Sequence, residues 1–111
     1  MELGRDRLVE MLRRMHRIRF FEQKIQPLFE KNCYECHGFN NRKGNLQLKT
    51  RELLLAGGDS GPAITPGDPE GSLLVQAVRH RSPDLRMPPQ RKLADRQIAD
   101  LEAWVRMGAP W

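Results

Sequence analysis

The chain has 111 residues, of which 39% are hydrophobic, 30% charged and 6% aromatic, and its net charge is +5. This length allows one small domain, and no apolar run approaches the roughly 20 residues that a membrane-spanning helix needs. The excess of basic residues favours acidic partners, whether a protein surface, a membrane face or a nucleic acid.

Residues 1–19 predict an amphipathic helix. Its apolar side chains recur at steps of three and four residues, with arginines on the other face. The apolar set consists of Leu8, Met11, Leu12, Met15 and Ile18. Because carboxylates interrupt the stretch and it has no continuous apolar core, it is not a secretory signal. We expect it to pack within its own domain; a homodimer contact and an anchor at a membrane surface are the alternatives.

Residues 20–31 continue the helical pattern, with Phe21, Ile25 and Leu28 on one side. Pro27 lies inside this pattern, and a proline removes an intrahelical hydrogen bond and clashes with the preceding turn. We therefore expect a kinked or restarted helix that leads directly into the next motif.

That motif is the run Cys33-Tyr34-Glu35-Cys36-His37, which contains both cysteines of the chain. Two cysteines separated by two residues and followed by a histidine form the attachment motif of a c-type haem. The spacing lets both sulfurs form thioethers with the vinyl groups on one porphyrin edge, and it places the imidazole at the iron as the proximal ligand. The sequence therefore predicts one covalently attached haem c, bound by Cys33, Cys36 and His37.

A zinc site and a redox-active dithiol are weaker hypotheses for the cysteine pair. A structural zinc site needs about four nitrogen or sulfur ligands, and the sequence has no second cysteine pair. A thioredoxin-like redox pair needs a βαβ context, and nothing near residue 33 has the pattern of a strand. Haem attachment is the hypothesis that these residues favour.

The rest of the chain predicts short helices joined by long loops, with no strand and no repeat. Thr50 is a suitable N-cap for the first of these helices, which two glycines end. Asp68 followed by Pro69 is typical of the start of the second, and a glycine and a proline end the last. The expected ranges are 51–56, 68–80 and 95–107. The predicted fold is all-α, divided into an N-terminal basic helix (1–19) and a haem domain (20–111).

Haem iron has a second axial position, and its occupant separates electron carriers from haem proteins that bind or activate ligands. The candidates after the attachment motif are His80, Met87 and Met107. Two prolines follow Met87, so it is expected on a stiff, extended loop, whereas Met107 suits the role of a flexible gap-filler on a helix. Met87 is therefore the predicted ligand, with His80 as the alternative.

The proximal histidine also needs an acceptor for its other ring nitrogen, which fixes the tautomer and raises the basicity of the imidazole. The segment Gly61-Pro62-Ala63-Ile64 offers the Pro62 carbonyl for this role, with Ile64 against the haem ring. The alternative is that these residues form a plain turn.

The chain resembles the class I cytochrome c family, and more closely the planctomycete-type cytochrome c domain. The resemblance covers about residues 21–111. Besides the haem motif, the segments that carry it are 24–28, 43–48, 57–62, 66–69, 85–89 and 101–111. It implies a cytochrome c fold with long loops around one covalent haem. It also implies that His37 and Met87 are the axial ligands and that the Pro62 carbonyl is the partner of the proximal histidine.

The function implied by the resemblance is that of a monohaem cytochrome, which carries single electrons between redox partners and has no enzymatic activity of its own. The alternatives are a haem enzyme or gas-binding module with an open or labile sixth site, and an electron-relay domain of a larger oxidoreductase. Haem is attached to such domains outside the cytoplasm. We therefore expect a periplasmic or other extracytoplasmic location, and we expect this chain to be a trimmed or excised piece.

Basic residues flank the expected Met87 loop. They are Arg79, Arg81, Arg86, Arg91 and Lys92. We expect them to surround the exposed haem edge and to steer redox proteins with acidic docking surfaces; a generally solvated basic surface is the alternative. The chain has no nucleic-acid recognition motif, so nucleic acid is not an expected partner.

Overall fold

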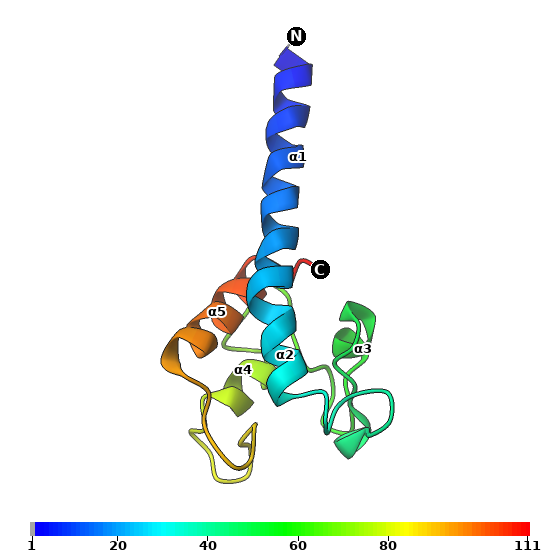
Figure 1. The fold of residues 1–111 in the computed structure, drawn as a ribbon, viewed down its shortest axis with the longest axis vertical. Coiled ribbons are helices and arrows are strands. Elements are labelled where there is room, and N and C mark those ends of the chain that lie inside the picture. Colours follow the sequence, from blue (N-terminus) through cyan, green and yellow to red (C-terminus); the bar gives the residue numbers. More distant parts are fainter. Residues whose placement is uncertain (1) are drawn as a thin grey trace.

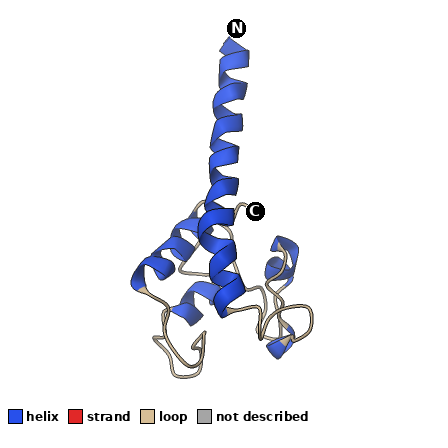
Figure 2. Ribbon diagram, viewed as in Figure 1, coloured by secondary structure: helices blue, strands red, loops and turns tan. Residues whose placement is uncertain are grey.

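The computed structural model describes residues 2–111, and these residues contain helices and loops but no strand (Figures 1 and 2). The all-α prediction is confirmed. In chain order the elements are α1 (Glu2–Phe20), the π-helical turn η1 (Phe21–Ile25), α2 (Gln26–Asn32), the 3₁₀ turn η2 (Lys43–Asn45), α3 (Arg51–Ala56), α4 (Leu73–Val78) and α5 (Asp95–Arg106).

The first three elements join end to end into one rod, which continues in Figure 1 without a sharp bend. The interruption expected near Pro27 is the turn η1, in which the Gln26 N–H donates to the Phe21 carbonyl, five residues back. Pro27 lies in the first turn of α2, where its missing N–H and its ring are tolerated. The widened turn therefore lets the helix restart at the proline instead of ending there.

An aromatic cluster joins this rod to α5. Phe21 stacks on Trp111 with ring centroids 4.1 Å apart, and Phe29 of α2 meets Trp104 of α5 edge-on at 5.8 Å. Trp104 is fully buried, and its indole N–H donates to the Pro110 carbonyl at 2.7 Å. The indole thus has a partner for its one polar group, and the cluster fixes α2 just before the attachment motif.

Helix α1 extends beyond this core in Figure 1, and the side chains of its apolar stripe are exposed. Leu8 is 53% exposed, Leu12 56% and Met15 42%, and the molecule measures 55 × 27 × 23 Å. The prediction that this helix packs within its own domain is wrong. The apolar faces of η1 and α2 already close the core, and α1 continues past its end. None of the described helices is both long and apolar enough to cross a membrane.

Helix α4 is shorter than the predicted range because it begins at Leu73. Asp68 caps a turn instead: its carboxylate accepts a hydrogen bond from the Gly71 N–H at 3.0 Å, and its carbonyl accepts one from the Ser72 hydroxyl at 2.8 Å. Ser72 is then the N-cap residue of α4. The predicted ranges for the other two short helices agree with α3 and α5 to within one residue.

Candidate functional site

A cavity of about 270 Å³ lies between the end of α2, helix α4 and the loops that connect the helices. The two predicted attachment cysteines, Cys33 and Cys36, and the two predicted axial ligands, His37 and Met87, all border it. Most of the remaining wall is apolar and includes Leu46, Leu48, Ala63, Leu74, Ala77 and Val78. The fold therefore brings the attachment motif and the predicted distal residue to one apolar cavity.

The two cysteines lie on the turn that ends α2. The N–H groups of Cys33 and Tyr34 donate to the Phe29 carbonyl at 2.8 and 3.0 Å, and the His37 N–H donates to the Cys33 carbonyl at 2.9 Å. One turn of chain thus carries both thiols and the imidazole. Because Phe29 belongs to the aromatic core, the core determines where this turn lies.

His37 is nearly buried, at 9% exposure, and its imidazole has one hydrogen-bond partner among residues 2–111. Its Nδ1–H donates to the carbonyl oxygen of Leu46 at 3.2 Å. The backbone of the same segment is also tied to this residue, since the Leu48 N–H donates to the His37 carbonyl at 2.9 Å. In a neutral imidazole this arrangement leaves Nε2 without a proton, which is the form that binds a metal.

In this structure the Leu46 carbonyl is the partner of His37, and the Pro62 carbonyl, which the sequence predicts for this role, makes no hydrogen bond with it. Ala63 lines the cavity, whereas Pro62 and Ile64 are not among its lining residues. Two backbone hydrogen bonds hold Ala63 at the cavity: its N–H donates to the Leu54 carbonyl at 2.9 Å, and its carbonyl accepts from the Leu74 N–H at 2.8 Å. Ile64 is 1% exposed and belongs to the protein core.

Two glycine-containing loops hold Leu46 in position. The Asp59 N–H donates to the Gly44 carbonyl at 2.8 Å, and the Asn45 side-chain amide donates to the Asp59 carboxylate at 2.6 Å. A β-carbon on Gly58 would collide with the Gly44 carbonyl and would lie 3.0 Å from the Leu46 Cβ. Glycine is thus needed at position 58 because the two loops approach so closely. No side-chain pattern in the sequence reveals this contact between loops.

Of the three candidates for the distal ligand, all in the described part of the chain, Met87 borders the cavity and the other two do not. Met87 is 38% exposed, and its N–H donates to the Ala77 carbonyl of α4 at 3.0 Å. His80 follows the end of α4, and its Nε2 is buried without a hydrogen-bond partner among the described residues. Met107 is 39% exposed and follows α5.

The environment of Cys33 differs from that of a reactive thiol. Burial, and then the nearby Cys36, raise the pKa of Cys33 to about 12. Redox-active cysteines have lowered pKa values, whereas burial shifts the pKa of Cys33 in the opposite direction. Within residues 2–111, no three His, Cys, Asp or Glu side chains are grouped closely enough to hold a metal ion. The described residues therefore support neither a dithiol redox site nor a zinc site.

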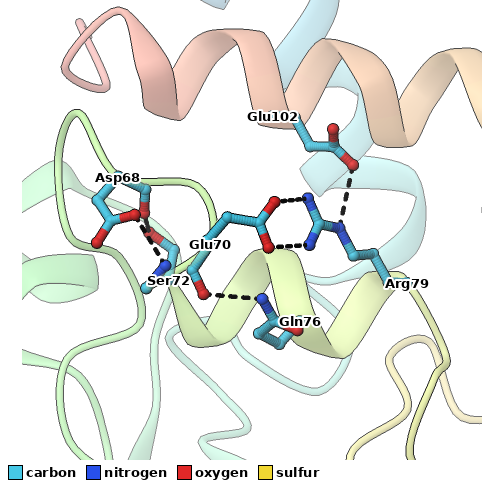
Figure 3. Close-up of polar contacts among 7 residues, drawn as sticks. Asp68, Glu70, Ser72, Gln76, Arg79 and Glu102 are labelled. Carbon is cyan, nitrogen blue, oxygen red and sulfur yellow. Dashed lines mark hydrogen bonds and ion pairs between the residues drawn. The ribbon is translucent and has the colours of Figure 1, made fainter.

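Arg79 is buried in an ion-pair network, so it is not part of the expected basic surface (Figure 3). Its guanidinium donates to both carboxylate oxygens of Glu70, at 2.8 and 2.9 Å, and to Glu102 at 3.2 Å. The hydrogen bonds from Arg79 lower the pKa of Glu70, and those to Glu70 raise the pKa of Arg79. The network ties α4 to α5. The other four members of the set are exposed: Arg81, Arg86, Arg91 and Lys92.

The residues around the cavity fit a covalently attached haem. Cys33 and Cys36 provide two thiols at the attachment spacing, and Nε2 of His37 is the free ring nitrogen. Met87 adds a thioether, and the wall offers the apolar contacts that a porphyrin needs.

Comparison with known protein families matches residues 33–91 to the planctomycete cytochrome C family. The match begins at the first attachment cysteine, contains Met87 and covers more than half of the chain. Neither the curated proteins nor the solved structures gave a match. On the strength of this match, the chain belongs to the planctomycete cytochrome c family.

Proposed function

We propose that this protein is a monohaem c-type cytochrome that passes single electrons between redox partners, with His37 and Met87 as the axial ligands of the iron. The haem-binding, electron-transfer class follows from the family. The observation that supports the finer assignment is the shared cavity, which Cys33, Cys36, His37 and Met87 all border. In this proposal residues 20–111 form the haem domain and residues 1–19 are an addition to it.

Each of these residues has a separate task. Cys33 and Cys36 hold the haem through thioethers, and the bond from His37 Nδ1–H to Leu46 keeps the imidazole in one orientation. The apolar wall excludes water, which favours the less charged ferrous state. When bound, the haem supplies reversible one-electron chemistry at iron. With both axial positions filled by protein, little has to move on electron transfer, and we propose no enzymatic activity for the isolated chain.

A second candidate is a haem enzyme or gas-binding module whose sixth ligand is labile. The exposure of Met87, at 38%, favours it, because a thioether on an accessible loop is easier to displace than a buried one. If this domain is instead the electron relay of a larger oxidoreductase, the residues at the site have the same roles as in the main proposal. In either case the family implies an extracytoplasmic location, and we propose the periplasm.

The ligand assignment is tested by ferric absorption spectra of the haem-loaded protein. Pyridine haemochrome analysis should give one haem per chain. The near-infrared charge-transfer band of methionine–iron ligation should be present in the wild type and absent in Met87→Ala, while the matched changes Met107→Ala and His80→Ala leave it intact. Loss of the band in His80→Ala, or its absence from the wild type, would overturn the assignment. Rapid binding of carbon monoxide by the wild type would favour the labile-site candidate.

A further inference from the structure

Helix α1 carries an exposed apolar stripe that the electron-transfer site does not use. Residues seven apart in an α-helix lie nearly in line, since seven residues make almost two turns. Leu8 and Met15 form one such row, and Met11 and Ile18 form the adjacent row. Leu12 lies beside Leu8 and Met15 on the side away from Met11. Four of these side chains are at least 42% exposed, and Ile18 is partly buried at the end nearer the core.

Arginines border this stripe on both sides. On one side, Arg7 and Arg14 form the row next to Met11 and Ile18. On the other side, Arg5 and Arg19 share the edge row of the stripe with Leu12. All four arginines are exposed, and none of them forms an ion pair among the residues that the structure describes.

The acidic side chains of α1 lie away from the stripe. Asp6 and Glu10 are four residues apart, beyond the row of Arg7 and Arg14. Glu10 pairs with Arg17 at 3.2 Å on that far face. The positive charge is therefore concentrated beside the apolar surface, while the far face is partly neutralised.

This arrangement disfavours a second copy of the chain as the occupant of the stripe. In a parallel helix pair, Arg14 would face Arg19 of the other copy across the apolar seam. In an antiparallel pair, Arg7 would face Arg14, and Arg5 would face Arg19. Like charges meet in both orientations, and Glu10, the carboxylate that neighbours Arg7 and Arg14 on the helix, is already paired with Arg17.

We propose that α1 is a membrane-surface anchor that lies on anionic lipid headgroups. The apolar stripe enters the boundary between headgroups and acyl chains, and the flanking arginines extend their long side chains to the phosphates. A helix of 19 residues is about 28 Å long, and α1 stands clear of the other elements along most of its length (Figure 1). The anchor holds the haem domain at the membrane, independently of which ligands the iron carries.

The test is co-sedimentation of the haem-loaded chain with vesicles of phosphatidylcholine, alone or with about 30% phosphatidylglycerol. The double variants Arg7→Gln/Arg14→Gln and Arg13→Gln/Arg17→Gln lose the same charge, the first beside the stripe and the second on the far face. An arginine at an anionic surface contributes roughly fivefold to the affinity. The first pair should therefore lower binding to the mixed vesicles about 25-fold, and the second should change it by less than about threefold. Leu8→Ser/Met15→Ser should lower it by about tenfold or more.

The haem spectrum of each variant reports whether the domain is still folded, because α1 lies outside the core. Absence of binding to the anionic vesicles overturns the proposal, and so do equal losses in the two arginine pairs. A dimer in sedimentation velocity that Leu8→Ser/Met15→Ser dissociates, without vesicle binding by the wild type, would assign the stripe to a second copy. Binding of an acidic peptide in place of the vesicles would assign it to a protein partner.

Discussion

The Nδ1–H of His37 and the carbonyl oxygen of Leu46 form a hydrogen bond of 3.2 Å at the wall of the haem cavity. Because the acceptor is a backbone group, the orientation of the imidazole depends on the path of residues 43–48 and not on any one side chain. That path is held in turn by the loop that contains Gly58 and Asp59. The proximal side of the site is thus supported by two loops in contact.

Replacing Gly58 by alanine should disturb this support. The new methyl group would collide with the Gly44 carbonyl and press on Leu46, and overpacking of this kind costs about 2 kcal/mol of unfolding free energy. A longer bond from His37 to Leu46 makes the imidazole less basic, so the midpoint potential should rise. Chemical denaturation and redox titration of the haem-loaded protein measure both effects.

The matched control for Gly58→Ala is Gly4→Ala, because a β-carbon on Gly4 would meet nothing within 4 Å. This control should leave the potential unchanged. If Gly58→Ala lowers the stability without changing the midpoint potential, the two loops contact each other but do not affect the basicity of the His37 imidazole.

The ion-pair network of Arg79 should make part of the unfolding free energy depend on pH. Hydrogen bonds from Arg79 hold the pKa of Glu70 below its usual value of 4.5, so the folded state favours the carboxylate. This contribution is fully present above pH 4.5 and is lost as the pH falls through the lowered pKa of the folded state. The unfolding free energy of the wild type should therefore decrease below pH 4.5 more steeply than that of Glu70→Gln.

Arg79→Met provides the second arm of this experiment. It removes the buried guanidinium and leaves the partly buried Glu102 without its partner, which should cost about 2 kcal/mol at neutral pH. In the Arg79→Met background, Glu70→Gln should have no further effect on the acid dependence. Additive effects of the two substitutions would show that the pair is not coupled.

The buried indole of Trp104 should contribute through its hydrogen bond as well as its volume. Trp104→Phe removes the N–H that donates to the Pro110 carbonyl at 2.7 Å and leaves a small cavity, so we expect a loss of about 2 kcal/mol in unfolding free energy. Trp111→Phe keeps the stacking on Phe21 and should cost less than about 1 kcal/mol. Equal losses would mean that the hydrogen bond contributes nothing measurable.

The sequence predicts best those features that depend on local chemistry. The attachment motif, the N-cap of α3 by Thr50 and the start of α5 at Asp95 each follow from neighbouring residues, and the structure has both helices where they were expected. Asp68 shows the limit of this reasoning, because its carboxylate caps a turn that Gly71 closes. The same short motif can begin a helix or a turn, and the residues that follow it decide which forms.

Features that depend on contacts between distant segments were not predictable. The partner of His37 is a main-chain carbonyl, and every residue offers one, so choosing Leu46 over Pro62 requires the paths of two loops. Arg79 looks like a surface cation in the sequence, yet Glu102 from α5 and Glu70 enclose it. For α1 the apolar spacing correctly indicated an amphipathic helix, but spacing alone cannot show whether the rest of the chain covers its apolar face.

The exposed cations near the Met87 loop should make small-molecule electron transfer depend on the charge of the reagent. Arg86 adjoins Met87 in the chain and is exposed, as are Arg81, Arg91 and Lys92. A positive potential at the haem edge attracts anions and repels cations, and salt screens both effects. The rate of oxidation by hexacyanoferrate(III) should therefore fall as ionic strength rises, whereas the rate with the cation tris(phenanthroline)cobalt(III) should rise.

Charge reversal at single positions locates the source of this field. Arg86→Glu should lower the rate with hexacyanoferrate(III) about fivefold or more at low salt and raise the rate with the cobalt complex. Arg106→Glu makes the same change of net charge in the last turn of α5, at the end of that helix farther from the Met87 loop, so it should have a much smaller effect on both rates. Equal effects of the two reversals would indicate that only the net charge of the protein matters, and flat salt dependence with both reagents would remove the steering role altogether.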